Sequence, residues 1–122
     1  MRTAIPVWGT EVSPVFDFAR RILVVESDLG HETTRFSYEL PKKSMSSRAE
    51  RLLALGADVL ICGAISNPLS KMVVSSGINL IPWKCGPVEE ILQAYFSGSL
   101  QDPKFSMPGC RDREIGRTGT YP

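Results

Sequence analysis

The fold is decided by residues 58–82, which read DVLICGAISNPLSKMVVSSGINLIP. This stretch opens with a nearly continuous apolar run, residues 58–62, which is typical of a strand buried on both faces of a parallel sheet. Asn67 as the N-cap and Pro68 at the first helical position then begin a helix. A second apolar run, residues 78–82, follows that helix. Because strand-helix-strand connections are right-handed, this unit predicts two adjacent parallel strands with a helix packed on them.

Three further strands are predicted on the N-terminal side of this unit. The second and third of them form a hairpin, because residues 28–30 supply turn chemistry between them. One further helix is predicted on each side of the unit. The earlier one follows a capping box made by Ser47 and Glu50, and the later one repeats its apolar residues with the spacing of a helix. The predicted strands are residues 3–7, 22–26 and 33–40, and the predicted helices begin near residues 47 and 86.

This order of elements predicts an α/β fold in which helices pack on a mixed five-stranded sheet. The first strand can lie beside the fourth at the centre, which gives the strand order 3-2-1-4-5 with strand 2 antiparallel. One domain is expected over residues 1–105. A flexible tail is expected over residues 106–122, where prolines, glycines and arginines show no periodicity.

The composition excludes several classes of function. Lys and Arg total 14 against 13 Asp and Glu, so the chain lacks the broad basic field that nucleic-acid binding requires. The N-terminus has no signal-peptide core and no apolar stretch approaches membrane-spanning length, so a cytoplasmic protein without a membrane partner is expected. Three cysteines in such a chain favour free thiols or metal ligation over a disulfide framework.

The carboxyl ends of the three central strands are expected to share one edge of the sheet. Ligands of open α/β sheets bind at such edges, and the loops after Val7, Cys62 and Pro82 would meet there. The N-termini of two helices open onto the same edge. Because a helix N-terminus presents unpaired N–H groups and a partial positive charge, the edge should favour an anion, either a phosphate or an anionic metal–sulfur species.

The cysteines are the candidate metal ligands. Cys85 follows Lys84 and precedes a helix N-terminus, and both stabilise the thiolate, the form that binds metal. Cys62 ends an apolar strand, where it is either a small core residue or a ligand. Cys110 lies in the predicted tail, either as an exposed thiol or as a further ligand. The spacing of the three does not match a closed zinc site.

Features of common enzyme sites are missing from the predicted edge. His31, the only histidine, falls at the hairpin turn, and Asp17 is the one acidic residue near the edge. Neither a dinucleotide fingerprint nor a P-loop is present. Trp8 and Trp83, at strand ends, either wall a ligand pocket or pack under a loop. Binding is therefore favoured over catalysis.

Several short motifs, each weak alone, together resemble one family. They are Ala4-Ile5-Pro6-Val7, Ser13-Pro14-Val15-Phe16-Asp17, Ala19-Arg20, Cys62-Gly63-Ala64-Ile65 and Gly86-Pro87-Val88-Glu89-Glu90. In this order they resemble the dinitrogenase iron–molybdenum cofactor biosynthesis family, which includes NifX and the C-terminal region of many NifB proteins. The resemblance implies a ribonuclease H-like fold and a non-enzymatic role, because members bind or carry iron–molybdenum or other metal–sulfur clusters during cofactor assembly.

The resemblance also implies where a ligand would bind. Relatives often have His-Phe-Gly where this chain has Val15-Phe16-Asp17, so thiols and backbone N–H groups would have to carry more of the binding. The binding residues implied by position are Trp8, Ser13, Phe16, Cys62, Gly63, Ala64, Ser66, Lys84, Cys85 and Gly86, with Cys85, Cys62 and Cys110 as metal ligands.

Three hypotheses of function follow. The leading one is a non-enzymatic carrier of an iron–sulfur or molybdenum–iron–sulfur cluster or its precursor, which works with cluster-assembly proteins as a monomer or as a homodimer through the strand edge 33–40. The alternative is a regulatory module that binds a small anionic ligand or a partner protein, with incidental cysteines. The third, a thiol enzyme with Cys85 as nucleophile, lacks a nearby base.

Overall fold

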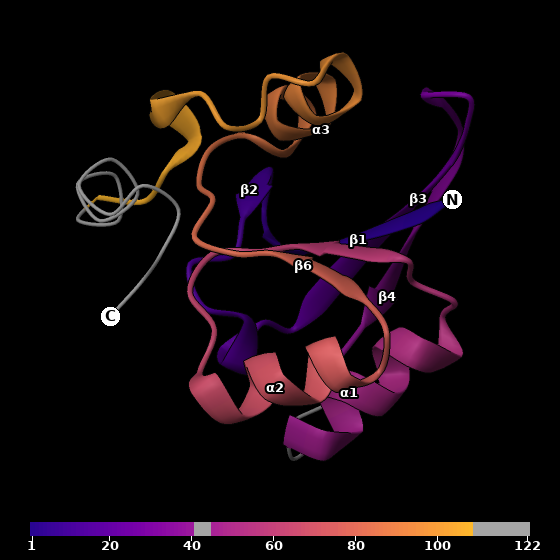
Figure 1. Cartoon of the computed structure of the whole chain (residues 1–122), viewed down its shortest axis with the longest axis vertical. Helices are drawn as coiled ribbons and strands as arrows, with labels where there is room; N and C mark the ends of the chain where they lie inside the picture. The colour runs from indigo at the N-terminus through magenta and orange to yellow at the C-terminus, as the bar shows by residue number, and fades with distance from the viewer. Residues whose placement is uncertain (41–44, 109–122) are drawn as a thin grey trace.

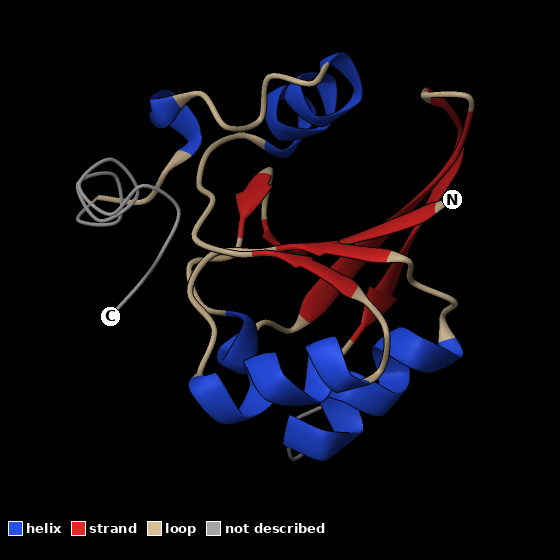
Figure 2. Cartoon of the chain, viewed as in Figure 1, coloured by secondary structure: helices blue, strands red, loops and turns tan. Residues whose placement is uncertain are grey.

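A mixed β-sheet crosses the middle of the molecule and carries helices on both faces (Figures 1 and 2). The structure, a computed structural model, describes residues 1–40 and 45–108. The described elements are β1 (Arg2–Trp8), β2 (Glu11–Val12), the 3-10 turn η1 (Phe16–Phe18), β3 (Arg21–Asp28), β4 (His31–Glu39), α1 (Met45–Ala54), β5 (Val59–Ile61), α2 (Asn67–Ser75), β6 (Asn79–Ile81), α3 (Val88–Ser97) and η2 (Pro103–Phe105).

The strands follow the order β4-β3-β1-β5-β6, and β2 pairs with the end of β1. β5 is parallel to both β1 and β6, whereas β3 is antiparallel to β1 and to β4. The mixed α/β class is confirmed, but within the described residues the sheet has six strands where the sequence predicted five. The additional strand, β2, has only 2 residues, which is too short to show an alternating pattern.

The side chains of β1 alternate between two hydrophobic cores. Ala4 belongs to the core under α1 and α2, to which Leu52 and Leu69 contribute from those helices. Ile5 points to the other face and belongs to the core under α3, together with Ile91. All five side chains are buried. The continuous apolar character of the central strands therefore reflects burial on both faces, as the sequence predicted.

Two helix starts differ from the prediction. Ser66, rather than Asn67, is the N-cap of α2, because its backbone is extended and its hydroxyl accepts a hydrogen bond from the amide of Leu69 at 3.4 Å. Asn67 is therefore already helical. α1 is helical from Met45, so Ser47 lies inside the helix rather than at its cap. Pro87 precedes α3, and Glu89 and Glu90 lie in its first turn as predicted.

The chain after α3 packs back onto the domain. Phe105 at the end of η2 and Ser106 are buried, and the amide of Met107 donates to the carbonyl of Trp83 at 3.0 Å. Residues 103–107 therefore cover part of the sheet edge, including the beginning of the segment predicted as a tail. Residues 109–122, with Cys110, lie outside the described residues.

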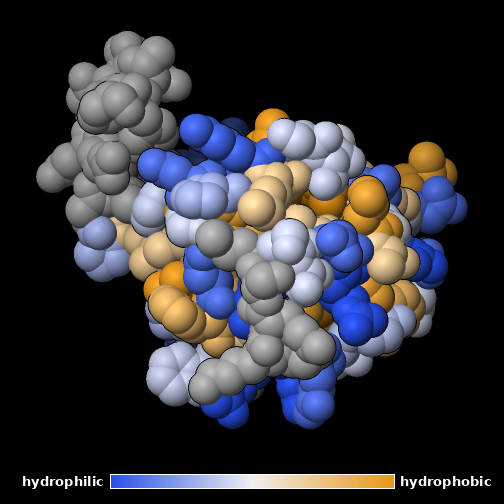
Figure 3. Space-filling view, turned by 90° about the horizontal axis from the view of Figure 1, so that it is seen from below, coloured by the Kyte–Doolittle hydropathy of each residue, from blue (hydrophilic) through white to orange (hydrophobic). Residues whose placement is uncertain are grey.

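The outer surface of α1 and α2 mixes hydrophilic and hydrophobic residues (Figure 3). The exposed apolar side chains there include Leu53 and Val74. Scattered exposed apolar residues are usual on protein surfaces, so no role follows from them. None of the helices within residues 1–40 and 45–108 has the length and apolar character needed to cross a lipid bilayer.

Candidate functional site

The first loop, residues 9–20, and the second loop, residues 62–66, run side by side at the carboxyl ends of β1 and β5. The amide of Phe16 donates to the carbonyl of Ala64 at 2.9 Å, and the amide of Ala64 donates to the carbonyl of Pro14 at 2.8 Å. These bonds form a short parallel bridge between the loops. The second loop therefore fixes the path of the first, as the sequence predicted when it brought these loops together at one edge.

Gly63 permits this close approach. A Cβ atom at Gly63 would lie 2.7 Å from the carbonyl oxygen of Pro14 and 2.8 Å from that of Ser13. Both are backbone atoms, which a side-chain rotation cannot move away. Gly63 therefore acts by leaving room for the first loop, and the structure gives it no direct role in holding a ligand.

The third loop, residues 82–87, uses many of its N–H groups within the protein. The amides of Trp83 and Lys84 donate to carbonyls of the second loop, each at 2.9 Å, and the amide of Cys85 donates to the carbonyl of Phe105 at 2.8 Å. The amide of Val88, the first residue of α3, donates to Thr10 at 2.9 Å. The amides of residues 83–85 and of Val88 are thus engaged by the chain itself.

The N-terminus of α2 is likewise supplied with an anion by the chain. The carboxylate of Asp17 accepts a hydrogen bond from the amide of Ser66 at 2.9 Å and another from its hydroxyl at 2.6 Å. A carboxylate in this position satisfies the helix end and its partial positive charge. Asp17, the residue that departs from the pattern of relatives, therefore ties η1 to α2.

The two described cysteines lie in different environments. Cys62 is fully buried in the core under α1 and α2. Burial, with a smaller contribution from the charge of Asp17, raises the pKa of its thiol to about 12, so the thiolate that a metal requires is disfavoured. Cys85 is half-buried, and its Sγ donates to the carbonyl of Ser106 at 3.4 Å. Burial argues against the ligand role predicted for Cys62, whereas that of Cys85 stays a prediction.

Alkylation should separate the two thiols. In the native protein at mildly alkaline pH, iodoacetamide is expected to modify Cys85 and to leave Cys62 unreacted, because the thiolate is the reactive form and Cys62 is buried. Peptide mass spectrometry after a timed reaction measures both. In urea the two should react alike. Rapid modification of Cys62 in the native protein would contradict its placement in the core.

The same burial predicts a fall in stability at alkaline pH. The ordinary pKa of the thiol, 9.0, applies to the unfolded chain, whereas the folded value is about 12. The folded state holds the proton more tightly, so the stabilising contribution is complete below the unfolded pKa and is lost as the pH rises toward the folded pKa. Between these two pH values, the free energy of unfolding measured with urea should therefore decline more steeply with pH in the wild type than in Cys62→Ala. Equal slopes would contradict the buried thiol.

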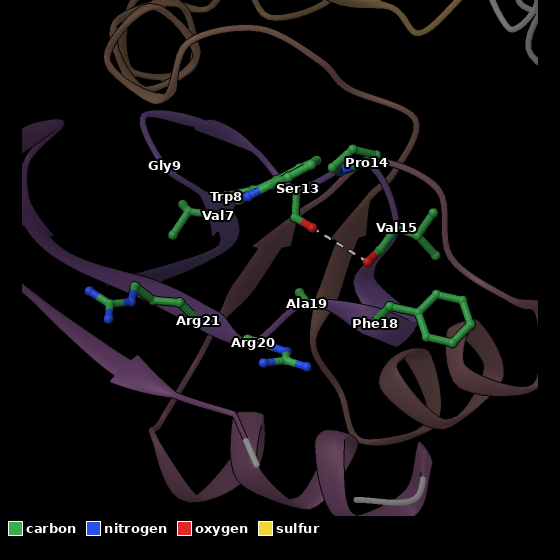
Figure 4. Close-up of a pocket in the computed structure, with 10 residues that line it drawn as sticks. All are labelled: Val7, Trp8, Gly9, Ser13, Pro14, Val15, Phe18, Ala19, Arg20 and Arg21. Atoms are coloured by element: carbon green, nitrogen blue, oxygen red, sulfur yellow. Dashed lines mark hydrogen bonds between the residues drawn. The ribbon is translucent and has the colours of Figure 1, made fainter. Parts of the chain in front are cut away.

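A pocket of about 620 Å³ opens between the end of β1, the first loop and the start of β3 (Figure 4). Figure 4 shows Trp8 next to Ser13 and Pro14, with Arg20 and Arg21 on the side of β3. The lining residues are Val7, Trp8, Gly9, Ser13, Pro14, Val15, Phe18, Ala19, Arg20 and Arg21. Two large aromatic side chains stay exposed at this pocket, since Trp8 is 75% and Phe18 is 81% accessible. Exposed aromatic residues around a concavity are typical of a binding surface.

The charge of the pocket is positive. Among the described residues, its lining includes two arginines and no acidic residue. Arg21 Nη2 lies 3.9 Å from Glu39 Oε1, and both side chains are largely exposed, so this pair is weak. The side chain of Arg20 makes no hydrogen bond or ion pair with the part of the chain that the structure describes. Both guanidinium groups are therefore available to an anion.

The turn η1, which contributes Phe18 to the pocket, is anchored in the core under α1 and α2. Phe16 of η1 is fully buried, and the buried Arg48 of α1 donates through Nη1 to the carbonyls of Phe16 at 3.2 Å and Ala19 at 2.7 Å. Burial lowers the pKa of Arg48. The sequence analysis missed Arg48, although its spacing from Leu52 and Leu55 places it on the buried face of the helix.

The predicted binding residues thus divide into three groups. Trp8 and Ser13 line the pocket, whereas the ring of Phe16 lies in the core and does not line the pocket. Gly63, Ala64 and Ser66 hold the first loop through backbone contacts and Asp17. Lys84, Cys85 and Gly86 lie in the third loop and do not line the pocket, and neither does Cys62. Phe18, Arg20 and Arg21 line the pocket but were not among the predicted binding residues, although they form an aromatic-basic run at the start of β3.

Fold and pocket together define a mixed α/β domain with a cationic, aromatic-walled pocket at one edge of its sheet. Solved structures share this fold. The crystal structure of PH0822 aligns over 92% of this chain and 98% of its own, with a TM-score of 0.80 and 18% identity. A dinitrogenase-like protein of Methanocaldococcus jannaschii aligns over 81% and 90%, with a TM-score of 0.66 and 18% identity. A NifB-like protein of Thermotoga aligns over 80% and 89%, with a TM-score of 0.67 and 20% identity.

The sequence identifies the family more narrowly than the fold does. Residues 1–98 match the family model described as dinitrogenase iron–molybdenum cofactor, and the chain belongs to this family. No protein of curated function matches the sequence. The resemblance found in the short motifs is therefore confirmed at the level of the family.

Proposed function

We propose that this protein is a non-enzymatic carrier that binds an anionic metal–sulfur cluster or cluster precursor during cofactor assembly. The cluster is of the iron–molybdenum cofactor type or a related one, and it is cargo rather than a resident cofactor. The observation that carries the proposal is the pocket with two arginines and two exposed aromatic rings, in a chain of this family. On this proposal the protein works in the cytoplasm, and its partners are cluster-assembly proteins. The strand order and the helix layers also support assigning the fold to the ribonuclease H-like class.

Each part of the pocket has a task in this proposal. Arg20 and Arg21 attract the anion and donate charge-assisted hydrogen bonds to its sulfur or oxygen atoms. The rings of Trp8 and Phe18 cover the cargo and exclude water, which strengthens those charge interactions. Such contacts are reversible, and a carrier needs reversible contacts because it must release its cargo to the next protein.

Cys85 offers a second place for a cluster. Its half-buried thiol lies in the third loop, but it donates to Ser106 and does not line the pocket. A cluster bound there would have to displace residues 103–107. We therefore favour the pocket, and a Cys85→Ser variant separates the two sites.

Anaerobic loading tests the proposed function. The protein is incubated with ferrous iron, sulfide and tetrathiomolybdate and then separated by gel filtration. We expect the protein fraction to retain iron and molybdenum and to absorb visible light. The double variant Trp8→Ala/Phe18→Ala should retain about tenfold less metal, since an aromatic contact contributes roughly 1 kcal/mol or more. Its matched control, Leu53→Ala/Val74→Ala, removes two exposed apolar side chains elsewhere and should load normally.

One result would overturn the carrier role, and another would overturn the pocket as its site. A wild-type protein that stays colourless and metal-free would exclude cluster carriage and favour the regulatory alternative, in which the pocket binds a small metal-free anion. Loading that depends on Cys85 and not on the aromatic pair would move the cluster to the third loop.

A further inference from the structure

The pocket combines cations with aromatic surface and lacks the side chains that coordinate metals. The ten lining residues within 1–40 and 45–108 include no Cys, His, Asp or Glu. Resting on the proposed function, we infer that the pocket selects large, polarisable anions whose metal centres already carry a complete ligand shell. It holds them by outer-sphere contacts alone. Bare metal ions and small hydrated anions such as phosphate are excluded.

The arginines account for the discrimination against bare metal ions. A guanidinium group stays protonated at all accessible pH values and has only donors, so it repels a metal cation and cannot coordinate one. Toward an anion with outward-facing sulfide or carboxylate groups it offers a fork of N–H donors. Arg20 and Arg21 both line the pocket, so each offers such a fork to an anion there.

The aromatic rings account for the discrimination against small anions. Trp8 and Phe18 contribute apolar surface to the pocket, so an anion that contacts the ring edges must lose part of its hydration. Desolvation costs more for a compact charge than for a diffuse one. Sulfur is polarisable and makes favourable contacts with aromatic rings, which adds affinity for a sulfide-covered surface. A phosphate gains the charge interaction without this contact.

The turn η1, which carries Phe18 and is followed by the two arginines, is preorganised. η1 is anchored by the buried Phe16, by the bonds from Arg48 to Phe16 and Ala19, and by the bonds between Asp17 and Ser66. Ordering a loop on binding lowers affinity, so a turn already fixed before the ligand arrives retains more of the contact energy. Each outer-sphere contact is weaker than a coordinate bond, so binding through such contacts requires that the cost of ordering the turn be small.

Three probes with different chemistry test the inference. Isothermal titration under anaerobic conditions compares tetrathiomolybdate, inorganic phosphate and ferrous ion with the wild-type protein. We expect binding of tetrathiomolybdate that weakens as salt rises, and binding of the other two that is at least about tenfold weaker. Arg20→Ala/Arg21→Ala should weaken tetrathiomolybdate binding about tenfold or more, since hydrogen bonds to charged groups contribute roughly 1.5–3 kcal/mol each.

A matched control removes two positive charges outside the pocket. Arg51 and Lys71 are exposed on α1 and α2, and Arg51→Ala/Lys71→Ala changes the net charge by the same amount. It should bind tetrathiomolybdate within about twofold of the wild type, since these exposed side chains do not line the pocket and salt screens their charges.

The outcomes separate the inference from the proposed function. If the protein loads clusters but needs Cys85 to do so, or binds ferrous ion as well as tetrathiomolybdate, the inference is wrong and the carrier role stands. If the arginine variant binds tetrathiomolybdate as the wild type does, the inference is also wrong. If the wild type binds neither tetrathiomolybdate nor a reconstituted cluster, both the inference and the carrier role are wrong.

Discussion

Replacing Phe16 with alanine is expected to lower the free energy of unfolding by about 3–5 kcal/mol. The ring is fully buried against the core under α1 and α2, and it anchors η1, on which the pocket is built. Truncation removes its apolar burial and leaves a cavity. The backbone of residue 16 accepts a hydrogen bond from the Arg48 side chain and donates one to the carbonyl of Ala64, so the cavity cannot close easily. Urea unfolding followed by far-UV circular dichroism measures the loss.

Phe18 is the matched control, because it lies on the same turn but is 81% exposed. Phe18→Ala should change the free energy of unfolding by about 0.5 kcal/mol or less and should weaken tetrathiomolybdate binding. The pair therefore separates the core side of η1 from its pocket side. Equal losses of stability in the two variants would mean that the turn does not have this orientation.

Replacing Gly63 with alanine is expected to have the second largest effect, a loss of about 3 kcal/mol of stability. The added methyl group would lie 2.7 Å and 2.8 Å from two carbonyl oxygens of the first loop, so the loop would have to move. The bridge between Val15 and Ala64 would open with it, and the pocket would lose its shape. Urea unfolding and tetrathiomolybdate titration of the variant measure the two consequences, and both should be impaired.

Gly77→Ala serves as the control for Gly63→Ala. Gly77 has a φ of +85° and nothing within 4 Å of a built Cβ, so only backbone strain opposes the substitution. That strain costs roughly 1–2 kcal/mol and lies far along the chain from the first loop. Binding should therefore survive in Gly77→Ala. A Gly63→Ala protein as stable as the wild type, with intact binding, would contradict the close approach of the two loops.

Most of the fold could be predicted because its central elements carry strong local patterns. The run from 58 to 82 alternates apolar strands with a helix that has clear start signals, and each pattern is decided within about ten residues. β2 could not be predicted, since two residues carry no period and pair only because the chain reverses after Trp8. The exact start of α2 also depended on long-range geometry, because the contact with Asp17 reinforces Ser66 as the cap.

The pocket lies at the sheet edge to which the sequence pointed, but its lining differs from the predicted set of residues. The sequence brought the right loops to one edge and included Trp8 and Ser13, which line the pocket. It assigned the anion to the helix N-termini, where the structure instead has Asp17 and backbone carbonyls. The contact between Asp17 and Ser66 joins residues 49 positions apart, so no local sequence pattern predicts it. Arg20 was noted only as part of a family motif, and neither it nor Arg21 carries a local pattern that predicts a pocket.

Fluorescence of Trp8 is the most direct test of the pocket as the binding site. The chain has two tryptophans, so Trp83→Phe leaves Trp8 as the only one. Titration of this protein with tetrathiomolybdate, corrected for absorption by the probe with a free tryptophan analogue, should quench Trp8 in a saturable way. The quenching should be reversed by salt and weakened about tenfold by Arg20→Ala/Arg21→Ala. Binding that saturates by calorimetry while Trp8 emission stays unchanged would contradict binding in this pocket.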